Sequence, residues 1–431
     1  GNGDDGQLGN GARGGETLPV LALGDGRAIA VAAARKLSCA LRADGSVACW
    51  GLGSSGQLGD GTLASWTPQP VLDLVAPTAV ATGGFHSCAI ADPNGSVYCW
   101  GANDDAQLGN LDGAPKARPV SANVSTAVQL ALGVDHACAR LRDGTVRCWG
   151  DGGDGQLGNG DTPSSSEPVQ VNGLSGVSAI AAGEDFTCAV NTSGVFCWGY
   201  DGNGELGDAV AGSGGSPQPV PTQVPGITGA TMIAAGHHHA CAGNSLGLKC
   251  WGQGADGQLG DGGNTAISPP VPVDGAGSGA MWTPARLAAG ADHTCAIDTA
   301  RRLRCWGDND SGELGDGSFH DHQVPAAVAI ALTASVFDVS TGDDGTCAQT
   351  SDGPMCWGEN YYGQVGDGGT VFQGAPVAVK LAGTTAFPMA GGGHACAVVS
   401  GQVLCWGDNA DGQLGIGTFS VSLVPTSVVF P

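Results

Sequence analysis

The sequence predicts an all-β protein, a β-propeller of four-stranded antiparallel blades, with eight blades favoured over seven. Three observations predict it. The tripeptide Cys-Trp-Gly occurs eight times, with its Trp residues 49 to 55 residues apart. Seven residues after each of these Trp, a Gln or Glu opens a tripeptide of the Gln-Leu-Gly type, and a second Cys precedes each Cys-Trp-Gly by 9 to 11 residues. Units of this size without helical periodicity are typical of small sheets that stack radially.

Each pair of Cys brackets a predicted β-hairpin. Between Cys39 and Cys49, two short strand-like runs flank Asp44-Gly45, which is turn chemistry because Gly accepts positive φ. Opposed residues of antiparallel strands have Cα atoms about 4.5–5.5 Å apart, within reach of a disulfide. The sequence therefore predicts one disulfide in each hairpin: Cys39 with Cys49, Cys88 with Cys99, Cys138 with Cys148, Cys188 with Cys197, Cys241 with Cys250, Cys295 with Cys305, Cys347 with Cys356, and Cys396 with Cys405.

Two other roles for these cysteines stay open. Zinc sites favour Cys separated by two to four residues, so the wider spacing fits zinc poorly. Eight pairs of reduced Cys would pack as small hydrophobes. Disulfides form in oxidising compartments, so the preferred pairing predicts an extracellular or cell-surface location, with the periplasm as a variant.

The repeat extends over residues 1–431, which we expect to form a single domain of about eight and a half units. There are eight hairpins, but the Gln-Leu-Gly loop occurs nine times, because Gln7-Leu8-Gly9 has no Trp before it. A closed ring needs equal numbers of both, so one terminal segment is surplus. A ring of seven blades would leave a whole hairpin without a place. The surplus end would be available for strand addition to another molecule.

The charge of the chain restricts its partners. Lys and Arg total 16 and Asp and Glu total 40, which gives a formal net charge of −24. Nucleic-acid binding and attachment to anionic membranes both require basic surfaces, so both are disfavoured. A negative surface favours basic partners and fast association at low salt. The expected partner is another protein, basic in character, or a second copy of this chain.

No catalytic motif is present, so we expect a protein that is not an enzyme and needs no cofactor. Five His hold one repeat position, two residues before the first Cys, and we expect them to make hydrogen bonds between turns: His86, His136, His239, His293 and His394. Metal binding at His237-His238-His239, or at His320-Asp321-His322, is the alternative.

Two acidic loops resemble the start of a calcium-binding loop, at 308–313 and 408–412. Phe319 and Phe419 stand where the bidentate Glu would be expected, and Asp and Asn also cap turns. Calcium therefore stays an open alternative, and no metal site is predicted.

The eight repeat Trp are expected to be core anchors whose N–H groups find carbonyls. Trp66 and Trp282 lie instead in the variable segments, beside Pro68 and Pro284. They are the predicted partner contacts.

The tandem unit resembles the regulator-of-chromosome-condensation repeat. The resemblance lies in Ala-Ala-Gly-x-x-His-Thr-Cys-Ala, then Asp-Gly-x-Val-x-Cys-Trp-Gly, then Asn-x-x-Gly-Gln-Leu-Gly-Asp-Gly. It implies a propeller, typically of seven four-stranded blades, in a family that includes a nuclear exchange factor for a small GTPase and secreted bacterial propellers that bind other proteins. The paired Cys and the negative charge depart from the nuclear pattern.

These observations lead to one expected function and two rivals. We expect an extracellular or cell-surface propeller that mediates protein–protein interaction. The first rival is a structural subunit of an extracellular filament or surface layer, assembled by terminal strand addition. The second is a hydrolase or lyase with its site in the central channel, and no residue pattern in the sequence supports it.

Overall fold

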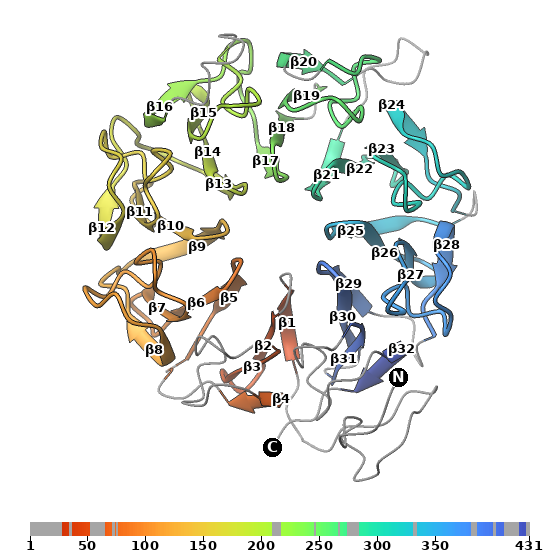
Figure 1. Ribbon diagram of the computed structural model, residues 1–431, viewed down its shortest axis with the longest axis horizontal. Coiled ribbons are helices and arrows are strands. Elements are labelled where there is room, and N and C mark those ends of the chain that lie inside the picture. Colours follow the sequence, from red (N-terminus) through yellow and green to blue (C-terminus); the bar gives the residue numbers. More distant parts are fainter. Residues whose placement is uncertain are drawn as a thin grey trace.

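The computed structural model describes residues 28–33, 37–51, 65–70, 74, 76–208, 217–244, 247–265, 268–273, 284–330, 334–380, 386–399, 402–408 and 422–427. Within these ranges the regular structure is entirely β, in eight four-stranded antiparallel sheets arranged radially around a central channel (Figure 1). No helix of the described residues is long and apolar enough to cross a membrane. The predicted propeller of four-stranded antiparallel blades is confirmed.

We number the blades in chain order. Blades 1 to 4 comprise β1 (Ala28–Ala33), β2 (Leu37–Arg42), β3 (Val47–Gly51), β4 (Ser65–Pro70); β5 (Ala79–Thr82), β6 (His86–Ala91), β7 (Ser96–Gly101), β8 (Lys116–Ser121); β9 (Ala127–Leu132), β10 (His136–Leu141), β11 (Val146–Gly150), β12 (Ser165–Gln170); and β13 (Ala179–Ala182), β14 (Phe186–Asn191), β15 (Gly194–Gly199), β16 (Gln218–Gln223).

Blades 5 to 8 comprise β17 (Met232–Ala235), β18 (His239–Asn244), β19 (Gly247–Gly252), β20 (Ser268–Pro272); β21 (Pro284–Ala289), β22 (His293–Asp298), β23 (Leu303–Gly307), β24 (His322–Ala327); β25 (Val336–Thr341), β26 (Gly345–Thr350), β27 (Gly353–Gly358), β28 (Gln373–Ala378); and β29 (Ala386–Ala390), β30 (His394–Val399), β31 (Gln402–Gly407), β32 (Ser422–Ser427).

Each blade runs outward from the channel in the order of its strands. The first strands of neighbouring blades contact one another, and β1 contacts β29 and β30, so the ring closes between the last blade and the first. The antiparallel meander gives the ring two faces. The first-to-second and third-to-fourth connections share one face, which we call the loop face. The second-to-third turns and the links between blades share the other, which we call the hairpin face.

Seven of the predicted Cys pairs are disulfides that join directly opposed residues of the second and third strands, with Cα atoms 4.1 Å apart. The hairpin register explains this pairing, because the two Cys are placed at equal distances from the turn. The confirmed disulfides are Cys39 with Cys49, Cys88 with Cys99, Cys138 with Cys148, Cys188 with Cys197, Cys241 with Cys250, Cys295 with Cys305, and Cys347 with Cys356.

For the eighth predicted pair, Cys396 with Cys405, the structure describes the backbone of both residues but the side chain of only one. Cys396 stands opposite Cys405 in the register of β30 and β31, as the prediction requires. The side chain of Cys405 lies outside the described part of the structure. One disulfide per blade is therefore confirmed for blades 1 to 7, and the bond in blade 8 stays a prediction.

The hydrophobic core lies between the blades. In one such layer the disulfide of blade 3, Cys138–Cys148, packs with Trp198 of blade 4. The indole N–H of Trp198 donates to the main-chain carbonyl of Gln156, in the Gln-Leu-Gly loop of blade 3, at 2.8 Å. The same bond to the preceding blade is made by Trp149, Trp251, Trp306, Trp357 and Trp406. The expected role of the repeat Trp as core anchors is confirmed for these residues.

The repeat His forms a second tie between blades. Nε2 of His136 lies 2.9 Å from the hydroxyl of Thr187 in the next blade. That hydroxyl donates to the Gln156 carbonyl at 3.3 Å, so it must accept from His136 Nε2–H. His239 with Thr294 and His293 with Thr346 repeat the arrangement. The architectural role predicted for this His is confirmed at these three positions.

His86 of blade 2 has no threonine opposite it in blade 3. Ala137 stands where the hydroxyl would be, and Nε2 of the buried His86 has no hydrogen-bond partner among the described residues. In blade 4 the histidine itself is replaced by Phe186, which shares a core cluster with Ala240 of blade 5. A histidine with a threonine and a phenylalanine with an alanine are each self-consistent pairs, whereas His86 with Ala137 sets a polar donor against an apolar side chain.

Replacing Ala137 with Thr should therefore stabilise the protein. The new hydroxyl accepts from His86, and a buried hydrogen bond contributes about 1 kcal/mol to the free energy of unfolding. Urea unfolding of the variant and the parent protein measures the difference. The matched control is Ala240→Thr, which faces Phe186, gains no histidine donor and crowds a packed core. Equal gains from both variants would contradict the expected His–Thr tie.

Burial should also make stability depend on pH through His136. Burial lowers its pKa from 6.5 to about 4, so between these values the unfolded chain binds a proton that the folded chain excludes. The neutral His136 side chain therefore contributes fully to the free energy of unfolding above pH 6.5, and this contribution is lost as the pH falls towards 4. His136→Gln keeps an N–H donor but does not titrate. From neutral pH to about pH 4, the parent should lose about 3 kcal/mol relative to this variant in urea unfolding; parallel stability curves would contradict this.

Candidate functional site

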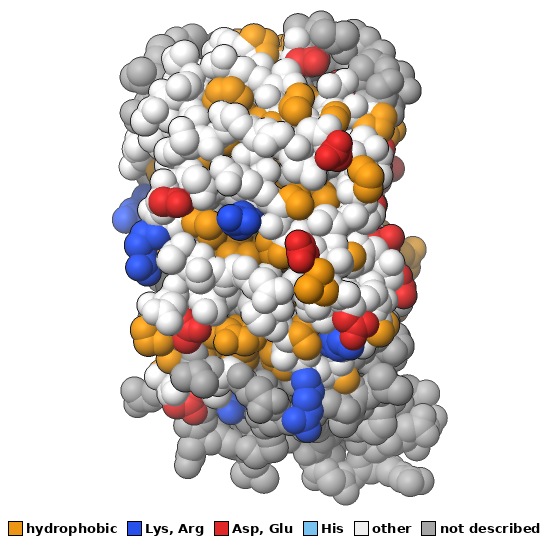
Figure 2. Space-filling view, turned by 90° about the vertical axis from the view of Figure 1, so that its left-hand side faces the viewer, with side chains coloured by type: hydrophobic (Ala, Val, Ile, Leu, Met, Phe, Trp, Pro, Cys, Tyr) orange, Lys and Arg blue, Asp and Glu red, His pale blue; other side chains and the backbone are white. Residues whose placement is uncertain are grey.

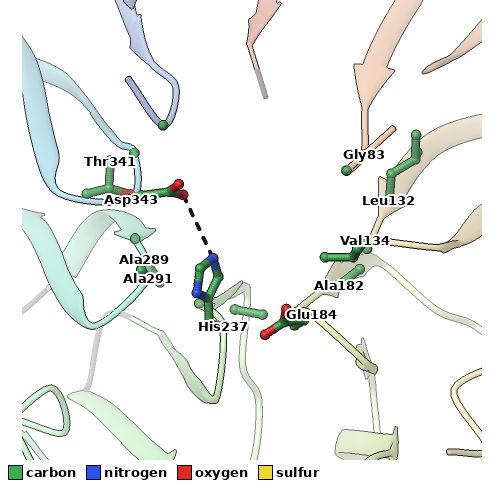
Figure 3. A pocket seen from close by; sticks show the side chains of 18 of the residues that line it. Gly83, Leu132, Val134, Ala182, Glu184, His237, Ala289, Ala291, Thr341 and Asp343 are labelled. Carbon is green, nitrogen blue, oxygen red and sulfur yellow. Dashed lines mark ion pairs between the residues drawn. The ribbon is translucent and has the colours of Figure 1, made fainter. Parts of the chain in front are cut away.

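The loop face opens into the mouth of the central channel, a cavity of about 270 Å³. The first-to-second loops of blades 2 to 8 line it with glycine and small side chains. Figure 3 shows three ionisable side chains among its lining residues, Glu184, His237 and Asp343. Glycine is required in these loops because a Cβ on Gly133 would lie 2.2 Å from the His136 ring and 2.9 Å from the Glu184 carbonyl oxygen. Neighbouring loops therefore pack against one another and hold the mouth in shape.

No Lys or Arg is among the described residues that line the mouth, and the one histidine in this lining is His237. Nε2 of His237 lies 3.8 Å from Asp343 Oδ1 (Figure 3). His238 lies between two carboxylates, with Nε2 3.4 Å from Glu184 Oε2 and Nδ1 3.3 Å from Glu205 Oε1. The hydrogen bond to Glu205 raises the pKa of His238, and this pair links blades 4 and 5.

Carboxylates surround the mouth on the loop face. The first-to-second loops carry Asp135, Glu184, Asp185, Asp292, Asp343 and Asp344. The third-to-fourth loops carry Asp104, Asp105, Asp112, Asp151, Asp154, Asp161, Asp201, Glu205, Asp208, Asp256, Asp261, Asp308, Asp310, Glu313, Asp316, Asp321, Glu359, Asp367 and Asp408. Most acidic residues of the described part of the chain thus lie on one face.

Basic residues gather at the opposite end. On the hairpin face and the strand ends beside it lie Arg42, Arg140, Arg142, Arg147, Lys249, Arg286, Arg301, Arg302, Arg304 and Lys380. The described Lys and Arg nearer the loop face are Lys116 and Arg118, in β8. In the side view of Figure 2, Lys and Arg side chains lie at the left-hand edge and also in the lower middle, and acidic side chains lie on both sides, most of them in the right-hand half. The molecule is therefore polarised along its channel axis.

Several acidic groups on the loop face hold their protons more tightly than usual. Burial, together with Glu184 and Asp154, raises the pKa of Asp185 to about 6. Burial raises the pKa of Asp308 to about 6 and that of Glu313 to about 8. Smaller increases caused chiefly by burial occur at Asp105, Asp135, Asp154, Asp256, Asp344 and Glu359. Burial, and in second place the neighbouring carboxylates, thus favour the neutral form of these groups, whereas a bound cation would favour their ionised form.

The predicted His cluster divides between two environments. His239 is buried between blades in its bond to Thr294, whereas His237 lines the channel mouth and both His237 and His238 lie beside carboxylates. His322 pairs with Asp316 at 2.7 Å. Among the described residues, no group of three potential metal ligands includes a histidine.

The predicted partner contacts are not placed by the structure. Trp66 belongs to β4, but its side chain is not among the described ones, and Trp282 lies outside the described residues. The acidic loop 308–313 is described in full, whereas of 408–412 only Asp408 is described.

The concentration of charge on one face was missed at the level of sequence. Its signal is nevertheless present, because acidic residues recur just before the repeat His position and around the Gln-Leu-Gly tripeptide. These two segments lie some 30 residues apart in the sequence, and only the meander of the strands shows that they come into contact. For example, Gln107 Nε2 donates to Asp135 Oδ1 at 3.0 Å.

Residues 1–285 match the model of the RCC1-like domain. The chain belongs to this family. Residues 285–313, 302–349 and 400–431 match the regulator of chromosome condensation (RCC1) repeat. The family matches thus extend over residues 1–349 and 400–431, which agrees with the resemblance seen in the repeat motifs.

Among curated proteins, the Arabidopsis thaliana ultraviolet-B receptor UVR8 is 35% identical over 151 residues, 35% of this chain and 34% of the receptor. The human E3 ubiquitin-protein ligase HERC2 is 32% identical over 139 residues, 31% of this chain and 3% of the ligase. The chain therefore spans about a third or less of these relatives.

Solved structures show the same fold. Human WBSCR16 has a TM-score of 0.66 and 20% identity, over 80% of this chain and 96% of that one. Prp20p of Saccharomyces cerevisiae has a TM-score of 0.59 and 21% identity, over 77% of this chain and 85% of that one.

The link between Glu205 and His238 gives a direct test of the electrostatics at the mouth. Glu205→Gln removes the buried carboxylate whose hydrogen bond raises the pKa of His238, so that pKa should fall. An NMR titration of the His238 imidazole measures it. Asp143→Asn, on the hairpin face, is the matched loss of one negative charge and should leave the His238 titration in place. An unchanged titration in the Gln variant would show that the pairing is absent.

Proposed function

We propose that this chain is a non-enzymatic interaction module that binds a basic segment of another protein on its loop face. The observation that carries the proposal is the polarity of the molecule, with carboxylates around the channel mouth and most described Lys and Arg residues at the far end. Carboxylates clustered around a recess focus the electrostatic field and accelerate the association of cationic partners.

The size and lining of the mouth favour a cationic side chain over a substrate. Its volume of about 270 Å³ lies just below the range of about 300–1,000 Å³ that is typical of small-molecule pockets. Backbone and small side chains line it, with Glu184 and Asp343 as the carboxylates. A Lys or Arg side chain of the partner fits this chemistry, while flanking basic residues would meet the outer carboxylates of the loop face.

The relatives support a protein partner in general terms. Yeast Prp20p is described as binding Gsp1p and histones, and a second yeast structure contains Kap60 bound to Prp20. Their likeness to this chain is one of fold. HERC2 is named as a ligase, but this chain covers 3% of its length, so we take no activity from it.

The proposal includes an oxidising compartment, such as the cell surface or the extracellular medium. Seven disulfides within the described residues support it, since such bonds persist where thiols are not kept reduced. The rival role as a filament subunit depends on the surplus segment near Gln7-Leu8-Gly9, which lies outside the described residues.

Charge removal at the mouth should weaken the binding of a basic probe. We expect the triple variant Glu184→Gln, Asp185→Asn and Asp343→Asn to bind fluorescent decalysine at least tenfold more weakly than the parent. Anisotropy at low salt and about pH 8, where Asp185 is ionised, measures this, and added salt should weaken binding by the parent.

The control triple variant is Asp92→Asn, Asp143→Asn and Asp352→Asn on the hairpin face. It changes the net charge equally, and asparagine preserves the acceptors that cap those turns. Equal weakening by the two triple variants would show attraction to overall charge and would refute a site on the loop face.

A further inference from the structure

One position of the repeat makes the same two kinds of hydrogen bond in each blade where the structure describes a glutamine there. In blade 3 the side-chain carbonyl of Gln156 accepts from the backbone N–H of Asp154 at 2.9 Å, and its amide donates to Asp151 Oδ2 at 2.8 Å. The corresponding amide donations run from Gln107 to Asp135, from Gln258 to Asp292 and from Gln364 to Glu359. The acceptor lies either early in the same loop or in the first-to-second loop of the next blade. The amide thus donates a hydrogen bond into a pocket of carboxylates.

Glutamate takes this position in blades 4 and 6. One oxygen of each glutamate keeps the local bond, since Oε2 of Glu205 accepts from Asn203 N–H at 2.8 Å and Oε2 of Glu313 accepts from Ser311 N–H at 3.0 Å. The other oxygen, Oε1, therefore stands where the amide nitrogen stands in the glutamine blades. An acceptor has replaced a donor at a buried position.

Blade 4 compensates for this exchange. His238 of blade 5 occupies the position that Asp135 holds in blade 3, and its Nδ1 lies 3.3 Å from Glu205 Oε1. Tyr200 occupies the position of Asp151. Both carboxylates that would repel Glu205 have thus been exchanged for groups that do not.

Blade 6 does not compensate. Asp308 holds the position of Asp151, and Asp344 of blade 7 holds the position of Asp135. One oxygen from each of Asp308, Glu313 and Asp344 lies within 4.8 Å of the other two. Glu313 is 1% exposed, and its Oε1 has no hydrogen-bond partner among the described residues. No ion pair joins these three carboxylates to a described basic side chain.

We infer that a divalent cation, Ca²⁺ by its ligand chemistry, binds among Asp308, Glu313 and Asp344 at the junction of blades 6 and 7. The cation takes the place of the amide group of the glutamine blades. Ca²⁺ binds oxygen ligands at about 2.3–2.6 Å, so two ligands of one ion lie up to about 5 Å apart. The three oxygens satisfy this spacing, and carboxylates without sulfur or imidazole favour hard cations over transition metals.

The site differs from the one that the sequence pattern suggested. The linear pattern expected ligands along 308–313 and a glutamate at the place of Phe319. The structure draws two ligands, Asp308 and Glu313, from this loop and takes the third, Asp344, from the next blade. A cation here would bridge two blades at the rim of the channel, independently of any protein partner.

Terbium luminescence tests the inference on the full chain. Tb³⁺ replaces Ca²⁺ at oxygen sites and is sensitised by a nearby indole, here Trp357, whose N–H donates to the Glu313 main-chain carbonyl at 2.7 Å. We expect sensitised emission that Ca²⁺ displaces, and at least a tenfold loss of Ca²⁺ affinity in Glu313→Gln. This variant restores the residue that other blades carry, so it should fold and remain stable without metal.

Glu205→Gln is the matched control, because it makes the same exchange at the blade whose pocket holds His238. It should keep the Ca²⁺ affinity of the parent. Thermal unfolding with Ca²⁺ and with Mg²⁺ provides the second measurement: either ion should raise the melting temperature of the parent and of Glu205→Gln more than that of Glu313→Gln. Absence of an ion-dependent shift in the parent, or equal Ca²⁺ affinity in parent and Glu313→Gln, would overturn the inference.

Discussion

The rest of this structure depends on one main-chain carbonyl in each of blades 2 to 7, that of the Gln or Glu in the Gln-Leu-Gly loop. It accepts the indole N–H of the next blade and, where threonine is present, a hydroxyl as well, as Gln156 does from Trp198 and Thr187. A four-stranded sheet of mostly small residues cannot bury enough surface to be stable alone. The bond sets the spacing at which a tryptophan covers the disulfide of the preceding blade.

Much of the fold could be predicted because this interaction is written in the sequence at fixed spacing. The hairpins, the cysteine pairs and the burial of the repeat tryptophans follow from local turn chemistry and register. The interblade partner of each tryptophan could not be predicted, since the acceptor is a main-chain carbonyl that leaves no mark in residue identity. The partner of His136 was similarly hidden, because Thr187 lies 51 residues away and only the radial packing brings them together.

The candidate site was less accessible to sequence for a different reason. Net charge is a sum, whereas function depends on where the charges lie. Asp135 and Asp151 are separated by a whole hairpin, and the meander returns both to the loop face. The turn residues Asp92 and Asp143 look equally acidic in the sequence but lie at the opposite end, where they cap turns. To tell the acidic residues of the loop face from those of the hairpin face, one must know which connections between strands lie on the same face.

Departures from an internal repeat then become informative, because seven neighbouring copies serve as references for each one. An exchange of Gln for Glu at a buried position removes a donor and adds a charge, and each copy must restore the balance within its own pocket. Glu205 has His238 beside it, which restores a positive partner within the protein. Glu313 has Asp308 and Asp344 instead, so no described basic side chain is there to balance the three groups when they are ionised. The two glutamates hold the same position of the repeat. The residues that neighbouring strands and blades place around them decide whether the glutamate forms an ion pair within the protein or belongs to a proposed cation site.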